Sequence, residues 1–179
     1  IRSSEFAERV IQNIYLVKKN VMKKSLPVAE QLLEKLQVLQ KNIDLSSTVH
    51  FGISHGDFTP WNMYSSENKL HVYDWELARR DAPVLFDLFH FIFQKEVMIR
   101  KSSLEKIEAE IRKALDLPAI KEFIKVFKID ADLHYKLYLL STVSYYLNVY
   151  LLQEKLHAQA YWLMDTWDEA LSRTLPAAE

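Results

Sequence analysis

Glycine is the residue whose scarcity most limits how this chain can fold. Only Gly52 and Gly56 occur among the 179 residues, where average usage of about 7% would give about twelve. A loop that wraps a phosphate in backbone amides needs several glycines, so the G-x-x-x-x-G-K-[ST] and G-x-G-x-x-G patterns are both excluded. Few glycines together with only five prolines also predict long helices and few tight turns.

Composition and charge exclude several classes of protein. Hydrophobic residues make up 49% and charged residues 26%, which is typical of a folded domain with a real core. The net charge is −1, whereas a nucleic-acid-binding domain is strongly basic, so we expect no nucleic-acid partner. The absence of cysteine excludes disulfides and thiol chemistry. The longest uncharged run, 137–153, is shorter than the roughly 20 residues of a membrane span, so we expect a buried helix there and no membrane span.

Hydrophobic periodicity predicts a mainly α (α+β) fold. Apolar residues recur every three or four positions in most of the chain, which indicates helices at 5–22, 26–41, 132–156 and 158–174 and three more between 84 and 127. The helix that Pro118 opens is expected to turn four residues inward: Ile120, Phe123, Ile124 and Phe127. Between 49 and 80 the helical period stops, and alternating residues predict a small β-hairpin whose last strand ends at Asp74. We therefore expect one lobe, 1–179, with a helical lead-in over 1–48, a loop and hairpin over 49–80 and a helical bundle over 81–179.

The irregular stretch also holds most of the residues with chemistry to offer. These are His55, Asp57, Asn62, Asp74 and Glu76, all with hard oxygen or nitrogen donors. Transfer of a phosphoryl group to a hydroxyl needs such a set, because one carboxylate must orient the attacking hydroxyl while other oxygens hold Mg²⁺ on the phosphates. No H-x-x-x-H pair occurs, so a zinc site is not expected.

Two segments together resemble a known family. His55-Gly-Asp-Phe-Thr-Pro-Trp-Asn62, followed by Val72-Tyr-Asp-Trp-Glu76, is similar to the H-G-D-x-x-x-x-N and D-x-E segments of the aminoglycoside phosphotransferase and choline kinase family, which has the protein-kinase-like fold. The resemblance covers the C-terminal lobe of that fold and is specific over residues 53–90. It implies a helical lobe in which a small β-hairpin carries the catalytic loop and the metal-binding segment.

The resemblance implies a role for each matched residue. Asp57 would be the catalytic base or would orient the acceptor hydroxyl, and His55 would brace the loop. Asn62 and Asp74 would bind Mg²⁺. Glu76 would lie on the substrate side or support the metal. Two further assignments complete the set: a structural role for Asp87, which would hydrogen-bond the catalytic loop, and either loop packing or a substrate contact for Trp61.

The implied activity is that of a small-molecule kinase in the cytoplasm. Its cofactors would be ATP and Mg²⁺, and its acceptor a hydroxyl of an aminoglycoside-, sugar- or choline-like compound. A non-catalytic kinase-like module that binds a ligand or partner is the main alternative, and a helical scaffold with a chance motif is another. The last predicted helix carries aromatic and acidic residues: Trp162, Asp165, Trp167, Asp168 and Glu169. Either a cleft for a cationic substrate or an ordinary amphipathic helix would explain this pattern.

One departure from the family pattern affects the expected activity. Nothing before residue 49 has the pattern of a β-rich nucleotide lobe, and no lysine there lies on a predicted strand. We therefore expect the N-terminal lobe to be absent from this chain, either because the chain is truncated or because the protein is a reduced relative with a short N-terminal region. In the first case the missing lobe of the same protein would be its partner. The exposed lobe interface would then be apolar and could self-associate, and the isolated chain would be inactive.

Overall fold

The computed structural model describes residues 4–24, 26–43 and 48–176, and the chain divides into two compact units. The first unit joins residues 1–48 to residues 136–179, and the second is residues 49–135. The predicted class is confirmed, since the described residues are mainly helical with four short strands. In the part that the structure describes, no helix has the length and apolar character needed to cross a membrane.

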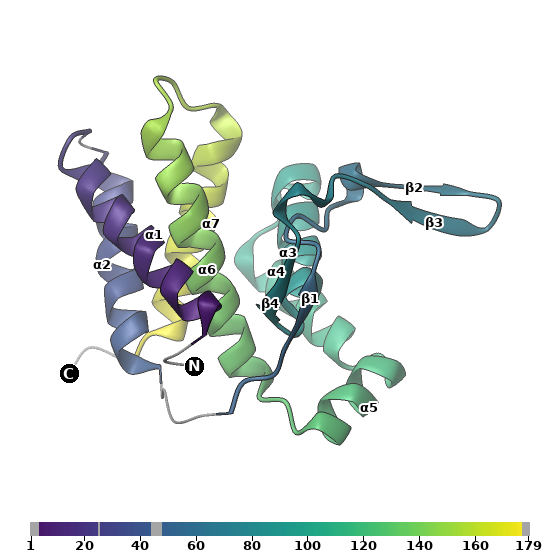
Figure 1. Ribbon diagram of the computed structural model, residues 1–179. Helices are drawn as coiled ribbons and strands as arrows, with labels where there is room; N and C mark the ends of the chain where they lie inside the picture. The colour runs from purple at the N-terminus through teal and green to yellow at the C-terminus, as the bar shows by residue number, and fades with distance from the viewer. Residues whose placement is uncertain (1–3, 25, 44–47, 177–179) are drawn as a thin grey trace. The chain divides into compact units, whose positions relative to one another are not determined.

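The first unit consists of helices (Figure 1). It contains α1 (Glu5–Val21), α2 (Pro27–Asn42), most of α6 (Ala131–Leu152) and α7 (Ala158–Thr174). Helix α2 packs against α7, and Lys35 Nζ lies 2.6 Å from Asp168 Oδ1. Trp167 is fully buried and its ring stacks with those of Tyr146 and Tyr150. Trp167 therefore fits an ordinary amphipathic helix and not a cleft for a cationic substrate, because its side chain lies in the core.

The second unit contains two separate two-stranded sheets, where the sequence predicted a single hairpin. Strand β1 (Phe51–Ser54) pairs antiparallel with β4 (Arg79–Pro83), and β2 (Met63–Ser66) pairs with β3 (Lys69–Val72). Strand β4 was not predicted, because Arg79-Arg80-Asp81 breaks the apolar alternation and only Ala82 and Pro83 are buried. Since β1 and β4 pair, residues 55–78 form one long connection between the two strands of this small sheet.

The β2–β3 hairpin projects from the rest of its unit (Figure 1). Its two-residue turn, Glu67-Asn68, has φ of 52° and 59°. Positive φ at both central residues is the signature of a type I′ turn, whose twist matches that of the strands. Strand β3 ends at Val72 and not at the predicted Asp74, because Asp74 has left-handed backbone angles (φ 64°, ψ 58°).

Helices follow β4 in the second unit. These are α3 (Phe86–Gln94), which continues into a π-helix at Lys95–Arg100, then α4 (Leu104–Leu115) and α5 (Pro118–Phe127). The predicted helix at 132–156 is α6, which begins at Ala131 and ends at Leu152.

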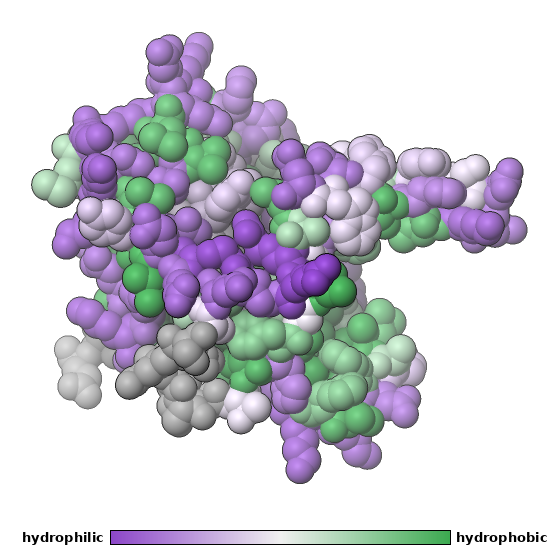
Figure 2. Space-filling view, viewed as in Figure 1, coloured by the Kyte–Doolittle hydropathy of each residue, from purple (hydrophilic) through white to green (hydrophobic). Residues whose placement is uncertain are grey.

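Helix α5 does not bury the residues that its periodicity predicted. None of its residues is buried, and Val126 and Phe127 are 64% and 49% exposed. Apolar residues gather over this helix in the space-filling view (Figure 2). The inward burial expected for Phe127 was therefore wrong, although the helix itself was predicted correctly.

Candidate active site

Asp87 holds the backbone of the H-G-D loop. Its Oδ2 accepts a hydrogen bond from the His55 amide at 2.7 Å, and its Oδ1 accepts from the Ser54 hydroxyl at 2.7 Å and the Gly56 amide at 3.1 Å. Asp87 lies in the first turn of α3, so the carboxylate ties the loop to the start of that helix. A carboxylate that accepts backbone N–H groups makes charge-assisted bonds, which are stronger than neutral ones.

Gly56 is needed where the loop turns. Its φ is +84°, and a Cβ placed there would lie 2.2 Å from the backbone oxygen of Leu77. Any other residue would meet both a left-handed backbone and a clash with a fixed carbonyl. The loop therefore passes directly against the segment that follows Asp74.

His55 connects the loop to that same segment. Its Nε2 lies 2.9 Å from the Tyr73 carbonyl, and its Nδ1 lies 3.3 Å from the Asp57 amide. Because a carbonyl accepts and an amide N–H donates, Nε2 carries the proton and Nδ1 is unprotonated. The buried ring also contacts Trp75, with centroids 4.6 Å apart. Both ring nitrogens are thus engaged in holding the backbone.

Asp57 has a donor on each carboxylate oxygen. His90 Nε2 lies 3.0 Å from Oδ1, and Asn62 Nδ2 lies 2.8 Å from Oδ2. Burial raises the pKa of this carboxyl, but the hydrogen bonds from His90 and Asn62 and the nearby imidazoles of His90 and His55 outweigh it. The pKa of Asp57 therefore lies below its ordinary value of 3.8, and the side chain is a carboxylate at neutral pH.

Asn62 and Asp74 lie on neighbouring segments at the base of the hairpin. Asn62 ends the short 3₁₀ turn Pro60–Asn62, and its carbonyl accepts a hydrogen bond from the Tyr73 amide at 3.1 Å, next to Asp74. The Asn62 amide nitrogen bonds both the side chain and the carbonyl of Asp57, which leaves Oδ1 as the atom that can face a cation. One amide oxygen and one carboxylate suit Mg²⁺, a hard cation that fills its other positions with water and phosphate oxygens. Among the described residues, no group of three or more His, Asp or Glu side chains could hold a metal ion.

The predicted substrate-side residues are exposed next to the loop. Glu76 lies in the 3₁₀ turn Trp75–Leu77, and Trp61 is 43% exposed. Trp75 is 53% exposed, and its Nε1 donates to the Val72 carbonyl at 3.0 Å. Neither tryptophan belongs to the core, and each leaves part of its ring at the surface, although the Trp75 ring also contacts His55. The roles of Glu76 and Trp61 stay predictions.

His90 is the residue of this site that sequence reasoning missed. It lies on α3, three positions after Asp87, and its side chain is fully buried. One signal pointed to it. A histidine within a helix that is apolar nearly all round has to find a polar partner, because burying an unpaired imidazole is costly.

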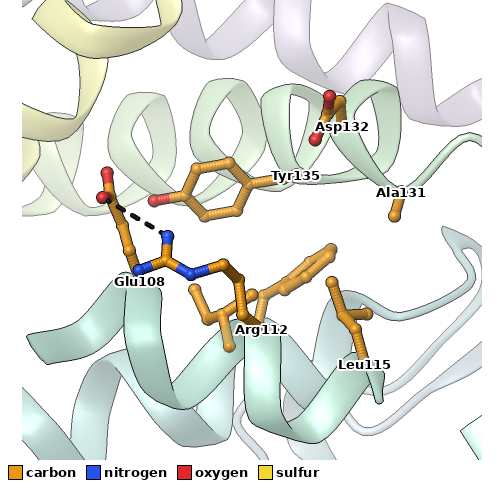
Figure 3. A pocket seen from close by; sticks show the side chains of 8 residues that line it. Glu108, Arg112, Leu115, Ala131, Asp132 and Tyr135 are labelled. Atoms are coloured by element: carbon orange, nitrogen blue, oxygen red, sulfur yellow. Dashed lines mark ion pairs between the residues drawn. The ribbon is translucent and has the colours of Figure 1, made fainter. Parts of the chain in front are cut away.

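A cavity of about 310 Å³ in the same unit lies apart from these residues. Its wall comes from α4, the start of α6 and Phe89, and it includes Tyr135 and the ion pair between Arg112 and Glu108, at 3.9 Å (Figure 3). None of the predicted site residues lines it. This cavity is therefore separate from the loop that carries the predicted site residues.

Comparison with known proteins identifies the family of the chain. The model of the phosphotransferase enzyme family (APH) matches residues 10–123, a range that includes every predicted site residue and His90. The Protein LicA homolog of Metamycoplasma hominis is 32% identical over 80 residues, which are 45% of this chain and 30% of that protein. The chain thus covers less than a third of this relative's length. No solved structure matches the chain. Because the family model covers more than half of the sequence, the chain belongs to the phosphotransferase enzyme family.

Proposed function

We propose that the protein transfers the γ-phosphoryl group of ATP to a hydroxyl of a small molecule in the cytoplasm, and that this chain supplies the catalytic lobe. The observation that carries the proposal is the arrangement around Asp57. A carboxylate kept ionised by two donors lies beside the amide that is oriented to present Oδ1 of Asn62, and Asp74 follows across the hairpin. Phosphoryl transfer needs this combination, because most of its catalysis is positioning and charge stabilisation.

Asp57 would orient the acceptor hydroxyl. Each carboxylate oxygen has two lone pairs, and the hydrogen bonds from His90 and Asn62 occupy one on each oxygen. The others are left for the hydroxyl, because the Asp57 side chain is 24% exposed. Since its pKa is lowered, Asp57 is a weak base. It would therefore accept the hydroxyl proton late, when the oxygen has begun to bond to phosphorus and has become acidic.

Asn62 Oδ1 and the Asp74 carboxylate would hold Mg²⁺. The ion, when bound, neutralises charge on the phosphate oxygens. The left-handed backbone of Asp74 ends β3 and starts the turn Trp75–Leu77 immediately after the hairpin base. That conformation is uncommon for a non-glycine residue, and such strain gathers at functional sites.

The face of the hairpin supports the nucleotide part of the proposal. Tyr64 and His71 are cross-strand partners whose exposed rings stack 4.7 Å apart with an interplanar angle of 8°. Tyr64 lies in β2, two positions after Asn62, so the exposed rings are close in sequence to the proposed magnesium ligand. An exposed aromatic surface next to a magnesium site suits the base of a nucleotide.

Trp61 and Glu76 support the acceptor class. An aromatic face together with a carboxylate suits a compound that carries an ammonium group. This favours an amino alcohol or aminoglycoside-like acceptor over a plain sugar.

The test is a phosphotransfer assay on the complete protein that contains this chain. ADP release is measured with choline, glucose and kanamycin as acceptor probes, with and without Mg²⁺. We expect Asp57→Asn to lower kcat at least about 100-fold, since general acid–base groups contribute about 10²–10⁴-fold. Asp74→Ala should remove Mg²⁺-dependent nucleotide binding.

Asp116→Asn is the matched control. Asp116 is exposed at the end of α4 and bonds Lys121, so its kcat should equal that of wild type. Full activity of Asp57→Asn would show that the Asp57 carboxylate does not orient the acceptor hydroxyl. Binding of MgATP without turnover by wild type would favour the non-catalytic module instead.

A further inference from the structure

We infer that His90 is a positioning residue for Asp57, which donates its Nε2–H to Oδ1 and sets the direction in which the carboxylate meets the acceptor hydroxyl. The catalytic purpose of this contact rests on the proposed function. The contact itself stands on geometry, because Nε2 lies 3.0 Å from Oδ1 and the histidine side chain is wholly buried.

Helix α3 acts on the loop at two points. Asp87, in its first turn, accepts hydrogen bonds from the backbone amides of His55 and Gly56, and His90, three positions later, bonds the side chain of Asp57. Residues three apart lie on the same side of a helix, so both contacts come from one face of α3. A single rigid element therefore holds both the loop and its catalytic carboxylate.

The imidazole has little freedom to turn. Its ring stacks on that of Phe86, with centroids 6.0 Å apart and an interplanar angle of 13°. The next residue, Phe91, contacts Phe58 at 5.9 Å, and Phe58 follows Asp57 in the loop. These contacts hold α3 against the loop at the point where His90 contacts Asp57.

Two donors fix a carboxylate better than one. With Asn62 Nδ2 alone, at 2.8 Å from Oδ2, the Asp57 carboxylate could rotate about that bond. The second donor from His90 fixes its plane, and the unused lone pairs then point in one direction. A misplacement of about 1 Å can cost about 100-fold in rate, so loss of this donor should be visible in turnover.

The role needs no change in the protonation of His90. A neutral imidazole with its proton on Nε2 is already the donor that Asp57 requires. This separates positioning from a proton relay, in which Nε2 would have to gain and lose the proton during each turnover.

Three substitutions at His90 test the inference in the complete protein. A Gln amide nitrogen reaches as far as Nε2, an Asn amide nitrogen falls short of it, and Phe keeps the ring without a donor. We expect His90→Gln to retain kcat for MgATP-dependent transfer within a few-fold. His90→Asn and His90→Phe should lower kcat about 10- to 100-fold with KM for MgATP unchanged, because Asn62 and Asp74 are intact.

His134→Phe is the control, since His134 is buried in the same unit and its Nδ1 lies 2.7 Å from the Asp130 carbonyl, within its own helix region. A purely structural role for His90 would lower the melting temperature of all three variants and leave kcat per folded molecule unchanged. That result, or equal kcat for the Gln and Phe variants, would overturn the inference.

Nuclear magnetic resonance of the ¹⁵N-labelled chain gives a readout that needs no activity. We expect the His90 Nε2–H proton to be slow to exchange in wild type and to lose that protection in Asp57→Ala. If the wild-type protein transfers no phosphoryl group, the proposed function is wrong, but the exchange of this proton still shows whether His90 donates a hydrogen bond to Asp57. An unprotonated Nε2, or a proton indifferent to Asp57→Ala, would refute the positioning role even in an active enzyme.

Discussion

At the scale of single residues, hydrogen bonds fix the orientation of several side chains of the site. Asn62 shows the consequence most clearly, because its amide nitrogen bonds Asp57 and leaves Oδ1 as the atom for the proposed cation. Both ring nitrogens of His55 are likewise hydrogen-bonded to backbone groups. In the proposed reaction, each of these hydrogen bonds would remove a side-chain rotation before substrate binds, and such preorganisation is the main source of catalysis in phosphoryl transfer.

Gly56→Ala tests whether the loop tolerates any side chain at its turn. The new Cβ would approach the Leu77 carbonyl to 2.2 Å at a φ of +84°. We expect the free energy of unfolding to fall by about 1–3 kcal/mol, as for other overpacked sites, and the position of Asp57 to change with it. Urea denaturation followed by circular dichroism measures the loss.

Gly52→Ala provides the comparison for this variant. Its Cβ would meet Val84 Cγ1 at 3.4 Å, which is nearly ordinary contact. We expect a change of less than about 1 kcal/mol. Equal losses for the two variants would show that the close approach to Leu77 does not constrain the loop.

The sequence could predict the residues of the site that belong to a spaced motif. His55, Asp57, Asn62 and Asp74 have fixed separations, and such separations are visible in one sequence. His90 has no such spacing, and its contact with Asp57 spans 33 positions and depends on how α3 lies against the loop. Long-range contacts of this kind become visible only when the elements are packed.

At the scale of elements, local signals succeeded where one face of a segment is buried or a turn has a strong preference. The helices were predicted within a few residues of their ends. Strand β4 has only Ala82 and Pro83 buried, so its existence depends on pairing with β1 and not on its own pattern. Helix α5 differs from β4, because its amphipathic pattern predicts the helix correctly although none of its residues is buried.

The π-helix Lys95–Arg100 was not predicted, and it contains Glu96, a buried carboxylate with several partners. Its buried carboxylate accepts from Arg100 Nη1 at 2.8 Å and Ser102 Oγ at 2.7 Å, and Lys95 Nζ lies 3.2 Å away. Burial raises the pKa of Glu96, but the Ser102 hydrogen bond and the two cations outweigh it. The pKa of Glu96 therefore lies below its ordinary value of 4.5 in the folded chain.

Glu96→Gln should destabilise the chain in a pH-dependent manner. Because the folded pKa is depressed, the stabilisation by Glu96 is complete above pH 4.5 and is lost as the pH falls through the folded pKa. At pH 7 we expect a loss of about 1–3 kcal/mol, since a buried group loses its charged partners. Urea denaturation between pH 3 and pH 7 should show the gap to wild type closing below pH 4.5.

Glu122→Gln, exposed on α5, should show almost no gap at any pH in the same measurement. A gap for Glu96→Gln that stays constant with pH would mean that the loss of one acceptor oxygen, and not the loss of charge, explains the effect.

At the scale of the whole molecule, the candidate site lies in one unit while the family match spans parts of both. All the residues that hold Asp57 lie between 49 and 135, and the family model begins at residue 10. The division inside α6 could not be read from the sequence, because the apolar pattern of that helix continues across it. The predicted segments 1–48, 49–80 and 81–179 stay a prediction.

A chain of these 179 residues should hold MgATP only weakly. Two glycines cannot form a phosphate-wrapping loop. Lys69 is the lysine found on a strand within the described ranges, and it lies beside the hairpin turn, three residue pairs from Met63 at the base. The triphosphate would therefore be held through Mg²⁺ on Asn62 and Asp74, with the base resting on the exposed hairpin face.

Two protein oxygens give Mg²⁺ a weak site, because the ion keeps several waters and depends on the phosphates for its remaining ligands. We expect a Kd of about 1 mM, near −4 kcal/mol, in calorimetric titration of MgATP into this chain. Asp74→Ala should abolish the heat, whereas Glu122→Gln should leave it unchanged, so the weak signal can be assigned to the hairpin base. Micromolar binding, or phosphoryl transfer to choline or kanamycin by this chain alone, would show that these residues already form a complete nucleotide site.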